Sequence, residues 1–218
     1  WGRGFRVVRD RSLNALHAFE WLIQSGRRYV IGACRSDIRR FEQELIEAKD
    51  WQRIRDDVEV KVCPSANGTE TYILCRSEAR KEKDRAIVGR AAERLSVCLE
   101  RLRKRLATAK SPVQRDRVNQ QIGRMLARHT RAAKKFLVEV RTNAGHPSGL
   151  ELVVQDNLAW QTWTERSAGC YLLRSNVSGW TEEELWRTYI QLTDAEAAFR
   201  IQKSDLSIRP VWHHREDR

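Results

Sequence analysis

The sequence has little methionine, little proline and no long apolar run. Of its 218 residues, one is methionine (Met125) and four are proline. No stretch approaches the roughly 20 apolar residues of a membrane-spanning helix, and no charged-then-apolar leader opens the chain. We therefore expect no membrane partner and no secretion. Because the first residue is Trp1 rather than methionine, the sequence is expected to be a fragment or a processed product.

Cysteines are also few, and their pattern excludes two classes of protein. The five cysteines are odd in number and are never spaced as Cys-x-x-Cys. This pattern argues against a disulfide framework and against a cysteine metal site. Free thiols in a reducing cytosolic compartment fit best.

The sequence is rich in positive charge. Lysine and arginine number 41 against 29 aspartates and glutamates, a net charge of +12 at pH 7. Such an excess favours polyanionic partners, because each neutralised phosphate releases counterions. Solubility alone is the simpler explanation, and nucleic acid is the interpretation that we favour. Acids are interspersed among the basic segments, which is not typical of a membrane-surface helix.

The first 34 residues have the pattern of a parallel α/β unit. A short strand over 5–9 ends at Asp10, helical spacing runs from Leu13 to Gln24, and a β-branched apolar strand follows over 28–34. Two strands joined by a crossover helix are typical of a parallel sheet. Residues 36–49 are predicted to form one further amphipathic helix.

After this point the pattern changes. The next segment is predicted to form an antiparallel hairpin with one solvent-exposed face. Polar and apolar residues alternate strictly over 57–62, a turn with Asn67-Gly68 follows, and a second strand-like apolar segment covers 71–75. The remaining predictions are helices over 78–110 and about 113–134, separated by Ser111-Pro112, and strands over 136–140, 150–154 and 169–174. We therefore expect an α/β core, 1–50 and 166–218, interrupted by an insertion of β-strands and a helical hairpin over 51–165.

Two clusters of basic residues lie in the helical hairpin. They are Arg101, Arg103, Lys104 and Arg105 in the first helix, and Arg128, Arg131, Lys134 and Lys135 at the end of the second. Ordinary solvated helix faces explain both clusters. A surface that tracks DNA is the alternative, and so is a hairpin that serves as an oligomerisation module.

The last helix carries residues at a distinctive spacing. Tyr189, Leu192, Glu196 and Lys203 are separated by three, four and seven residues, so a continuous helix places them on one face. Thr181 and Glu184 form a capping box that starts this helix. Thr193 and Glu196 form a second box, so a helix that is jointed at this point is the alternative to a continuous one. Glu196 is a candidate catalytic acid, and an ordinary surface acid is the alternative.

Asp10 is the second candidate acid. It follows a predicted parallel strand, at the sheet edge where α/β proteins place functional groups. A turn residue or a helix N-cap is the ordinary explanation for an aspartate in this position. Two-metal phosphoryl transfer needs carboxylates from several elements around two Mg²⁺ ions, and Asp10 and Glu196 are of the required type.

These motifs resemble the DDE transposases of bacterial insertion sequences, in the branch called insertion sequence family four. Its signature is Tyr, two residues, Arg, three residues, Glu, six residues, Lys. Tyr189, Glu196 and Lys203 fit this spacing, with Leu192 in place of Arg, and 204–213 looks like the usual continuation. Upstream, 10–13 and 29–32 are similar to the family's second-Asp turn and its next strand, with Ser12 replacing Gly.

The resemblance implies both a fold and a reaction. The core would be a ribonuclease-H-like mixed sheet, and Asp10 and Glu196 would bind Mg²⁺ or Mn²⁺, two ions in the complete enzyme. Tyr189, Lys203 and Arg200 would contact DNA. The implied partners are double-stranded DNA, at transposon ends and target, and a second copy in a homodimer. The implied location is the bacterial cytoplasm, and the implied reaction is cut-and-paste strand cleavage and transfer.

Two departures from the family pattern bear on activity. Residues 1–9 contain no Asp or Glu, so the first of the three family acids is missing from this chain. Leu192 removes a guanidinium that would clamp a phosphate. The chain as given is therefore expected to be an inactive catalytic-core fragment. The alternative is a non-catalytic basic DNA-binding protein derived from the same fold.

Overall fold

The structure of this chain is a computed structural model with a mixed α/β fold. It describes residues 5–8, 21, 23–63, 65 and 68–205, but not the side chains of 5–8 or of several residues late in the last helix. The chain divides into two compact units. Unit 1 comprises Trp1–Cys75 and Tyr171–Arg218, and unit 2 comprises Arg76–Cys170.

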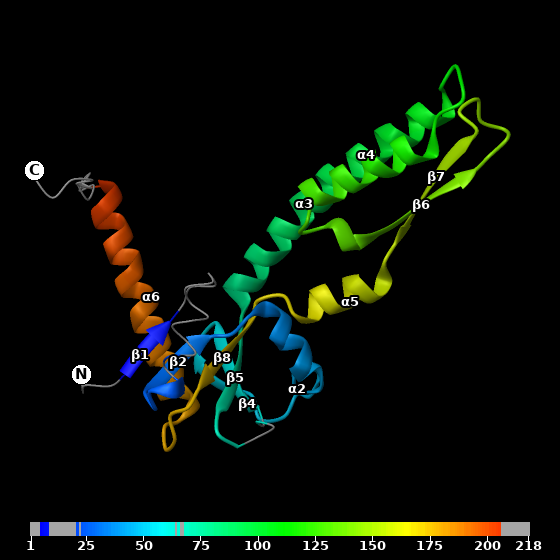
Figure 1. Cartoon of the computed structure of the whole chain (residues 1–218). Helices are drawn as coiled ribbons and strands as arrows, with labels where there is room; N and C mark the ends of the chain where they lie inside the picture. Colours follow the sequence, from blue (N-terminus) through cyan, green and yellow to red (C-terminus); the bar gives the residue numbers. More distant parts are fainter. Residues whose placement is uncertain (1–4, 9–20, 22, 64, 66–67, 206–218) are drawn as a thin grey trace, which may run out of the picture. The chain divides into compact units, whose positions relative to one another are not determined.

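Unit 1 is built on one six-stranded sheet of order β1-β2-β8-β5-β4-β3 (Figure 1). The parallel pairing expected at the start of the chain is confirmed, with Val8 of β1 opposite Ile31 of β2. β2 with β8 and β3 with β4 are antiparallel, so the sheet is mixed. The crossover helix expected over 13–24 lies mostly outside the described residues. The strands are β1 Phe5–Val8, β2 Arg28–Gly32, β3 Gln52–Arg55, β4 Val58–Cys63, β5 Thr71–Ser77 and β8 Cys170–Ser175.

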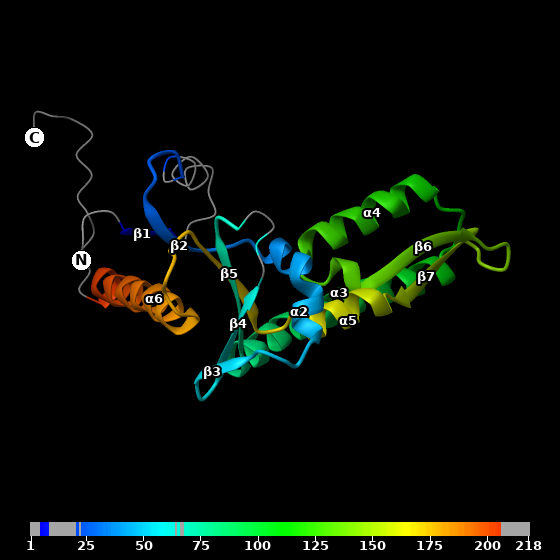
Figure 2. The ribbon, with the colours of Figure 1, turned by 90° about the horizontal axis from the view of Figure 1, so that it is seen from below.

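Helices cover both faces of this sheet (Figure 2). On one face, helix α6, Glu182–Asp205, contacts β2 and β4 and buries Leu185 and Trp186 in an apolar cluster. On the other face lie η1, Arg35–Phe41, and α2, Glu42–Ile46. The helix expected over 36–49 is therefore confirmed only as far as Ile46, and its first part is a 3₁₀ helix and not an α-helix. The buried Ile38 and Phe41 are three residues apart, which matches the repeat of a 3₁₀ turn.

The hairpin strand β5 lies deep in the sheet. Tyr72, Ile73, Leu74 and Cys75 are all buried, so the expected wet face is wrong for this strand. β5 pairs between β8 and β4, and its two sets of alternating side chains enter opposite layers. Ile73 and Cys75 join the cluster under α6, whereas the Tyr72 ring packs on Phe41 at 5.2 Å.

A buried carboxylate connects three neighbouring strands of this sheet. Glu70, just before β5, accepts hydrogen bonds from the Tyr29 hydroxyl of β2 and, at 2.6 Å, from Arg174 Nε of β8. The Glu70 side chain is only 9% exposed. Burial raises the pKa of Glu70, but the hydrogen bonds from Arg174 and Tyr29 outweigh burial and hold that pKa below its usual value. Burial and the Glu70 carboxylate raise the pKa of Tyr29.

Unit 2 contains the helical hairpin and a second sheet (Figure 1). Leu95, Leu99, Leu102 and Leu106 of α3 form a buried stripe at helical spacing. α3 contacts α4 and β7, which confirms the predicted hairpin. Its elements are α3 Glu78–Ala107, α4 Arg115–Arg128, η2 Ala133–Lys135, β6 Phe136–Thr142, β7 Leu150–Asp156 and α5 Leu158–Arg166, and β6 and β7 pair antiparallel.

The boundaries of the insertion differ from the expected ones. Residues 52–77 were expected inside an insertion over 51–165, but β3, β4 and β5 belong to the six-stranded sheet. The compact units meet at 75/76 and 170/171. The physical reason is that β5 and β8 pair side by side, so the chain leaves the sheet after β5 and returns into β8.

Gly169 lies directly before β8, where the chain returns from unit 2 to the six-stranded sheet. It has φ +74°, and a Cβ there would lie 2.5 Å from the Ser77 carbonyl oxygen and 2.7 Å from Lys81 Cβ. The backbone therefore approaches more closely than any side chain permits. Ser77 N–H donates to the Gly169 carbonyl at 3.2 Å, which holds the two chain segments together.

We expect Gly169→Ala to lower the free energy of unfolding by about 3 kcal/mol, because left-handed strain adds to the clash with the backbone. Gly149→Ala is the matched control, since Gly149 has φ +73° and open space around it. That variant should lose only about 1–2 kcal/mol. Urea unfolding measures both, and equal losses would contradict the close approach.

Glu70→Gln should lower the free energy of unfolding by about 2–3 kcal/mol at pH 7, because Arg174 keeps its charge without a charged partner. The folded pKa of Glu70 is depressed, so its contribution is complete above the unfolded pKa of about 4.3. That contribution disappears as pH falls through the folded pKa. Urea unfolding from pH 7 to pH 3 should therefore show the difference between wild type and Glu70→Gln shrinking in acid. A difference in unfolding free energy that stays constant with pH would contradict an ionised Glu70 carboxylate. Glu139→Gln is the control, because Glu139 forms an exposed ion pair with Arg141, and it should have little effect on stability.

Candidate nucleic-acid interface

Tyr189 is the predicted DNA-contacting residue that the structure describes in full. It lies on α6 and is half-buried against the apolar cluster under that helix. A Cβ at Gly32, the last residue of β2, would lie 3.0 Å from the Tyr189 hydroxyl oxygen. The Tyr189 ring therefore packs α6 against the sheet, and its hydroxyl group lies beside the last residue of β2.

The other predicted residues are only partly described. Asp10 lies outside the described residues, and so do the side chains of Glu196, Arg200 and Lys203. Their backbone forms part of α6, in which Glu196 follows Tyr189 by two turns, about 10 Å. In the sequence, Asp10 comes two residues after Val8, which pairs with Ile31. The strand that precedes Asp10 in the sequence pairs with β2, and the helix that contains Glu196 packs on β2.

The first capping box is confirmed, and of the two alternatives for this helix the continuous one is observed. Thr181 N–H donates to Glu184 Oε2 at 2.8 Å, and Glu184 N–H donates to Thr181 Oγ1 at 3.2 Å. α6 then runs without a break from Glu182 to Asp205. Because Thr193 lies inside this helix, the second box-like pattern does not start a new one. The backbone requirement for Tyr189, Glu196 and Lys203 to share a helix is met.

The positive charge is concentrated in one unit. Unit 2 has 21 lysines and arginines against ten aspartates and glutamates, so it carries +11 of the net +12. Unit 1, with 20 against 19, is almost neutral. A count over the whole chain misses this segregation. A count by unit would have found it, but the unit boundaries come from the fold.

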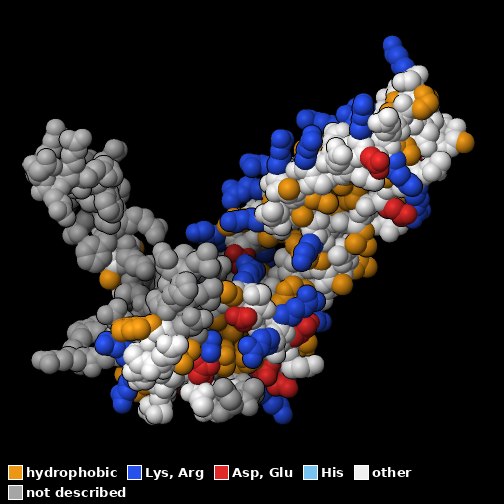
Figure 3. Space-filling view, in the orientation of Figure 1, with side chains coloured by type: hydrophobic (Ala, Val, Ile, Leu, Met, Phe, Trp, Pro, Cys, Tyr) orange, Lys and Arg blue, Asp and Glu red, His pale blue; other side chains and the backbone are white. Residues whose placement is uncertain are grey.

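Many cations of unit 2 have no acidic partner in the part of the chain that the structure describes. In the first predicted basic cluster, Arg103 and Lys104 pair with Glu100, and Arg105 donates to Gln121. The exposed cations for which no described acid lies within ion-pair distance are Lys83, Arg90, Arg94, Arg101, Lys110, Arg117, Arg124, Arg128, Arg131 and Lys134. The second predicted cluster contributes more of them than the first. Figure 3 shows Lys and Arg side chains along the edge of unit 2 formed by α3 and α4.

The described residues contain neither a metal-binding cluster nor a helix that could span a membrane. Among the described side chains, no three or more of His, Cys, Asp and Glu gather in a way that could hold a metal ion. This result does not bear on the predicted Mg²⁺ ligands Asp10 and Glu196, whose side chains lie outside that set. Within the described residues, every helix is too short or too polar to cross a membrane.

Comparison with known proteins gave no relative. No protein-family model, no curated protein and no solved structure matches the chain. The function must therefore be argued from the residues and the geometry.

We expect Gly32→Ala to cost about 1–2 kcal/mol of unfolding free energy, because the added methyl group presses on the Tyr189 hydroxyl. In a Tyr189→Phe background the same substitution should cost less, with a coupling of about 1 kcal/mol. A double-mutant cycle by urea unfolding measures this coupling. An equal cost in both backgrounds would mean that Tyr189 does not lie against Gly32.

Proposed function

We propose that this chain is a DNA-binding part of a DDE-type transposase and that unit 2 supplies most of its affinity for the DNA backbone. The observation that carries the proposal is the segregation of charge. Eleven of the twelve excess positive charges lie in unit 2, and ten exposed cations there have no described acidic partner. Such cations release counterions from a polyanion when they bind it.

The shape of the charged surface favours an extended polyanion. α3 has 30 residues, which corresponds to about 45 Å of helix. Its unpaired cations run from Lys83 to Arg101, and those of α4 from Arg117 to Arg128. One turn of B-DNA rises about 34–36 Å. A rod of this length can therefore follow DNA phosphates over about a helical turn.

A lipid surface fits these helices less well. A helix that lies on a membrane inserts an apolar face beneath its basic one. In α3 the apolar face is already occupied, because Leu95, Leu99 and Leu102 are at most 2% exposed within unit 2. The exposed side of the hairpin is polar and basic, which suits phosphates in water.

The transposase part of the proposal rests on the sequence signature. The parallel β1–β2 pair and the packing of α6 on β2 support it, whereas the antiparallel pairing of β2 with β8 is not part of the expected parallel unit. Asp10 and Glu196 stay the predicted ligands of Mg²⁺ or Mn²⁺, which when bound would activate the attacking oxygen and stabilise the leaving one. DNA contacts by Tyr189, Arg200 and Lys203, a homodimer and a bacterial cytoplasmic location also stay predictions.

A second candidate is a DNA-binding protein without catalysis. The same charge segregation favours it, since none of the ten unpaired cations in unit 2 is part of the predicted acidic site. The two candidates differ only in what Asp10 and Glu196 do. They are therefore separated by the metal binding of these two acids and not by DNA binding.

We expect the full chain to bind a fluorescein-labelled DNA duplex, measured by fluorescence anisotropy. If about six phosphates are neutralised, log K should fall against log [NaCl] with a slope near −5 between about 50 and 200 mM. Affinity that is absent at low salt, or independent of salt, would contradict the proposal.

The chain lacks the first family acid and is expected not to cut DNA, so the acidic site is tested by the binding of Mn²⁺, measured by electron paramagnetic resonance. Glu196→Gln should abolish Mn²⁺ binding and leave DNA affinity unchanged, whereas the matched helix variant Glu183→Gln should keep both. Mn²⁺ binding that survives Glu196→Gln would contradict the assignment of Glu196. A wild-type chain that binds DNA tightly but does not bind Mn²⁺ would favour the second candidate.

A further inference from the structure

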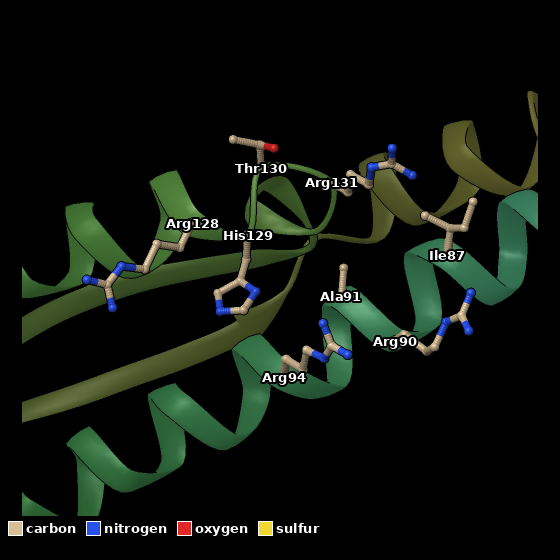
Figure 4. A pocket seen from close by; sticks show the side chains of 8 residues that line it. All are labelled: Ile87, Arg90, Ala91, Arg94, Arg128, His129, Thr130 and Arg131. Atoms are coloured by element: carbon tan, nitrogen blue, oxygen red, sulfur yellow. The ribbon is translucent and has the colours of Figure 1, made fainter. Parts of the chain in front are cut away.

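Unit 2 contains a pocket of about 400 Å³ between α3 and the end of α4. Its lining comes from two segments, 87–94 in the middle of α3 and 128–131 at the end of α4 and in the turn after it (Figure 4). Four of the lining residues are arginines, namely Arg90, Arg94, Arg128 and Arg131. We call this pocket with its four guanidinium groups the arginine cleft.

Local structure explains why the cleft is open. α4 ends at Arg128, and the His129 N–H closes the last turn onto the Met125 and Leu126 carbonyls. The chain then turns back through Ala132, which is fully buried and donates its N–H to the His129 carbonyl. On the α3 side, Ala91 contributes only a methyl group to the lining. A short side chain opposite a tight turn leaves the space unfilled.

The charged side chains that line the cleft are all positive. Neither aspartate nor glutamate lines it. All four arginines are exposed and, among the described residues, make neither an ion pair nor a side-chain hydrogen bond. Arg90 and Arg94 also repel each other, because they are four residues apart on one helix. An anion in the cleft would relieve this repulsion and satisfy the guanidinium donors.

The directions of the side chains indicate what kind of anion fits. In Figure 4 the His129 ring extends from the turn toward α3, whereas the Arg94 guanidinium extends along α3 toward Ala91. Arg90, Arg128 and Arg131 point outward around the rim. The four charges therefore do not converge on one point. A single small ion would meet only some of them, whereas successive phosphates of one strand would meet all four.

We propose that the arginine cleft holds consecutive backbone phosphates of a DNA strand and is the principal DNA-anchoring site of unit 2. This inference rests on the proposed DNA binding and adds to it a location and a mode of contact. Arginine suits the role, because its planar fork donates two hydrogen bonds to one phosphate. The phosphate chemistry is shared with free phosphate and pyrophosphate, which the experiment must separate from the strand.

The test compares two double variants of the full chain that lose the same charge. Arg94→Ala with Arg128→Ala removes one guanidinium from each wall of the cleft. Arg101→Ala with Arg117→Ala removes two exposed, unpaired cations from the same two helices outside the cleft. None of the four side chains has a described ion-pair partner, so both proteins should fold, and thermal unfolding by circular dichroism checks this.

In the anisotropy assay, the cleft variant should bind the duplex at least about tenfold more weakly than the control variant. Its salt slope should be lower than that of wild type by about 2, one for each lost phosphate contact. Equal affinities of the two variants, with wild type still binding DNA, would overturn the cleft and leave the proposed function intact. If the wild-type chain fails to bind DNA, both the arginine cleft and the proposed function are contradicted.

The source of the phosphate is decided by calorimetry with inorganic phosphate and pyrophosphate at constant ionic strength. We expect neither ion to bind wild type at micromolar concentration, because the guanidinium groups diverge. Micromolar binding of either ion that disappears in the cleft variant, with DNA affinity unchanged, would overturn the assignment to a strand.

Discussion

The Glu70 carboxylate is the interaction on which the rest of unit 1 depends. It accepts hydrogen bonds from Tyr29 on β2 and from Arg174 on β8, and it lies next to β5. The two partners are 41 and 104 residues away in the sequence. A half-buried guanidinium is costly without such an acid, so the Glu70–Arg174 pair favours the strand order β2-β8-β5. That order places β2, from the first part of the chain, beside β8, which comes more than 130 residues later, and α6 packs on β2.

The two units differ in how completely their charges are satisfied. In unit 1, acids and bases nearly balance, and even the buried Lys61 reaches the Glu44 carbonyl and the Glu47 carboxylate. In unit 2, ten exposed cations have no described acidic partner. Fold stability gains nothing from unpaired like charges along two helices. Their presence is most simply explained by a polyanion, and this argument does not depend on any catalytic residue.

The candidate site was only partly accessible to sequence reasoning. The spacing of Tyr189, Glu196 and Lys203 correctly placed all three on one helix, and the strand before Asp10 pairs parallel to β2 as expected. No sequence pattern indicates the arginine cleft. Arg128 and Arg131 belong to a basic cluster in the sequence, but Arg90 and Arg94 lie almost 40 residues earlier, one turn apart on α3. Only the antiparallel packing of α3 and α4 brings the two pairs to one pocket.

The sequence by itself determined the local elements, because helix and strand formation depend on neighbours a few residues apart. The leucine stripe of α3, the Thr181–Glu184 capping box and the apolar run of β2 were all sufficient signals. The tertiary structure decided which strands share a sheet. It placed β3, β4 and β5 with β8, buried both faces of β5, and moved the unit boundary to 75/76. Those outcomes depend on pairing between segments about 100 residues apart, and no local periodicity carries that information.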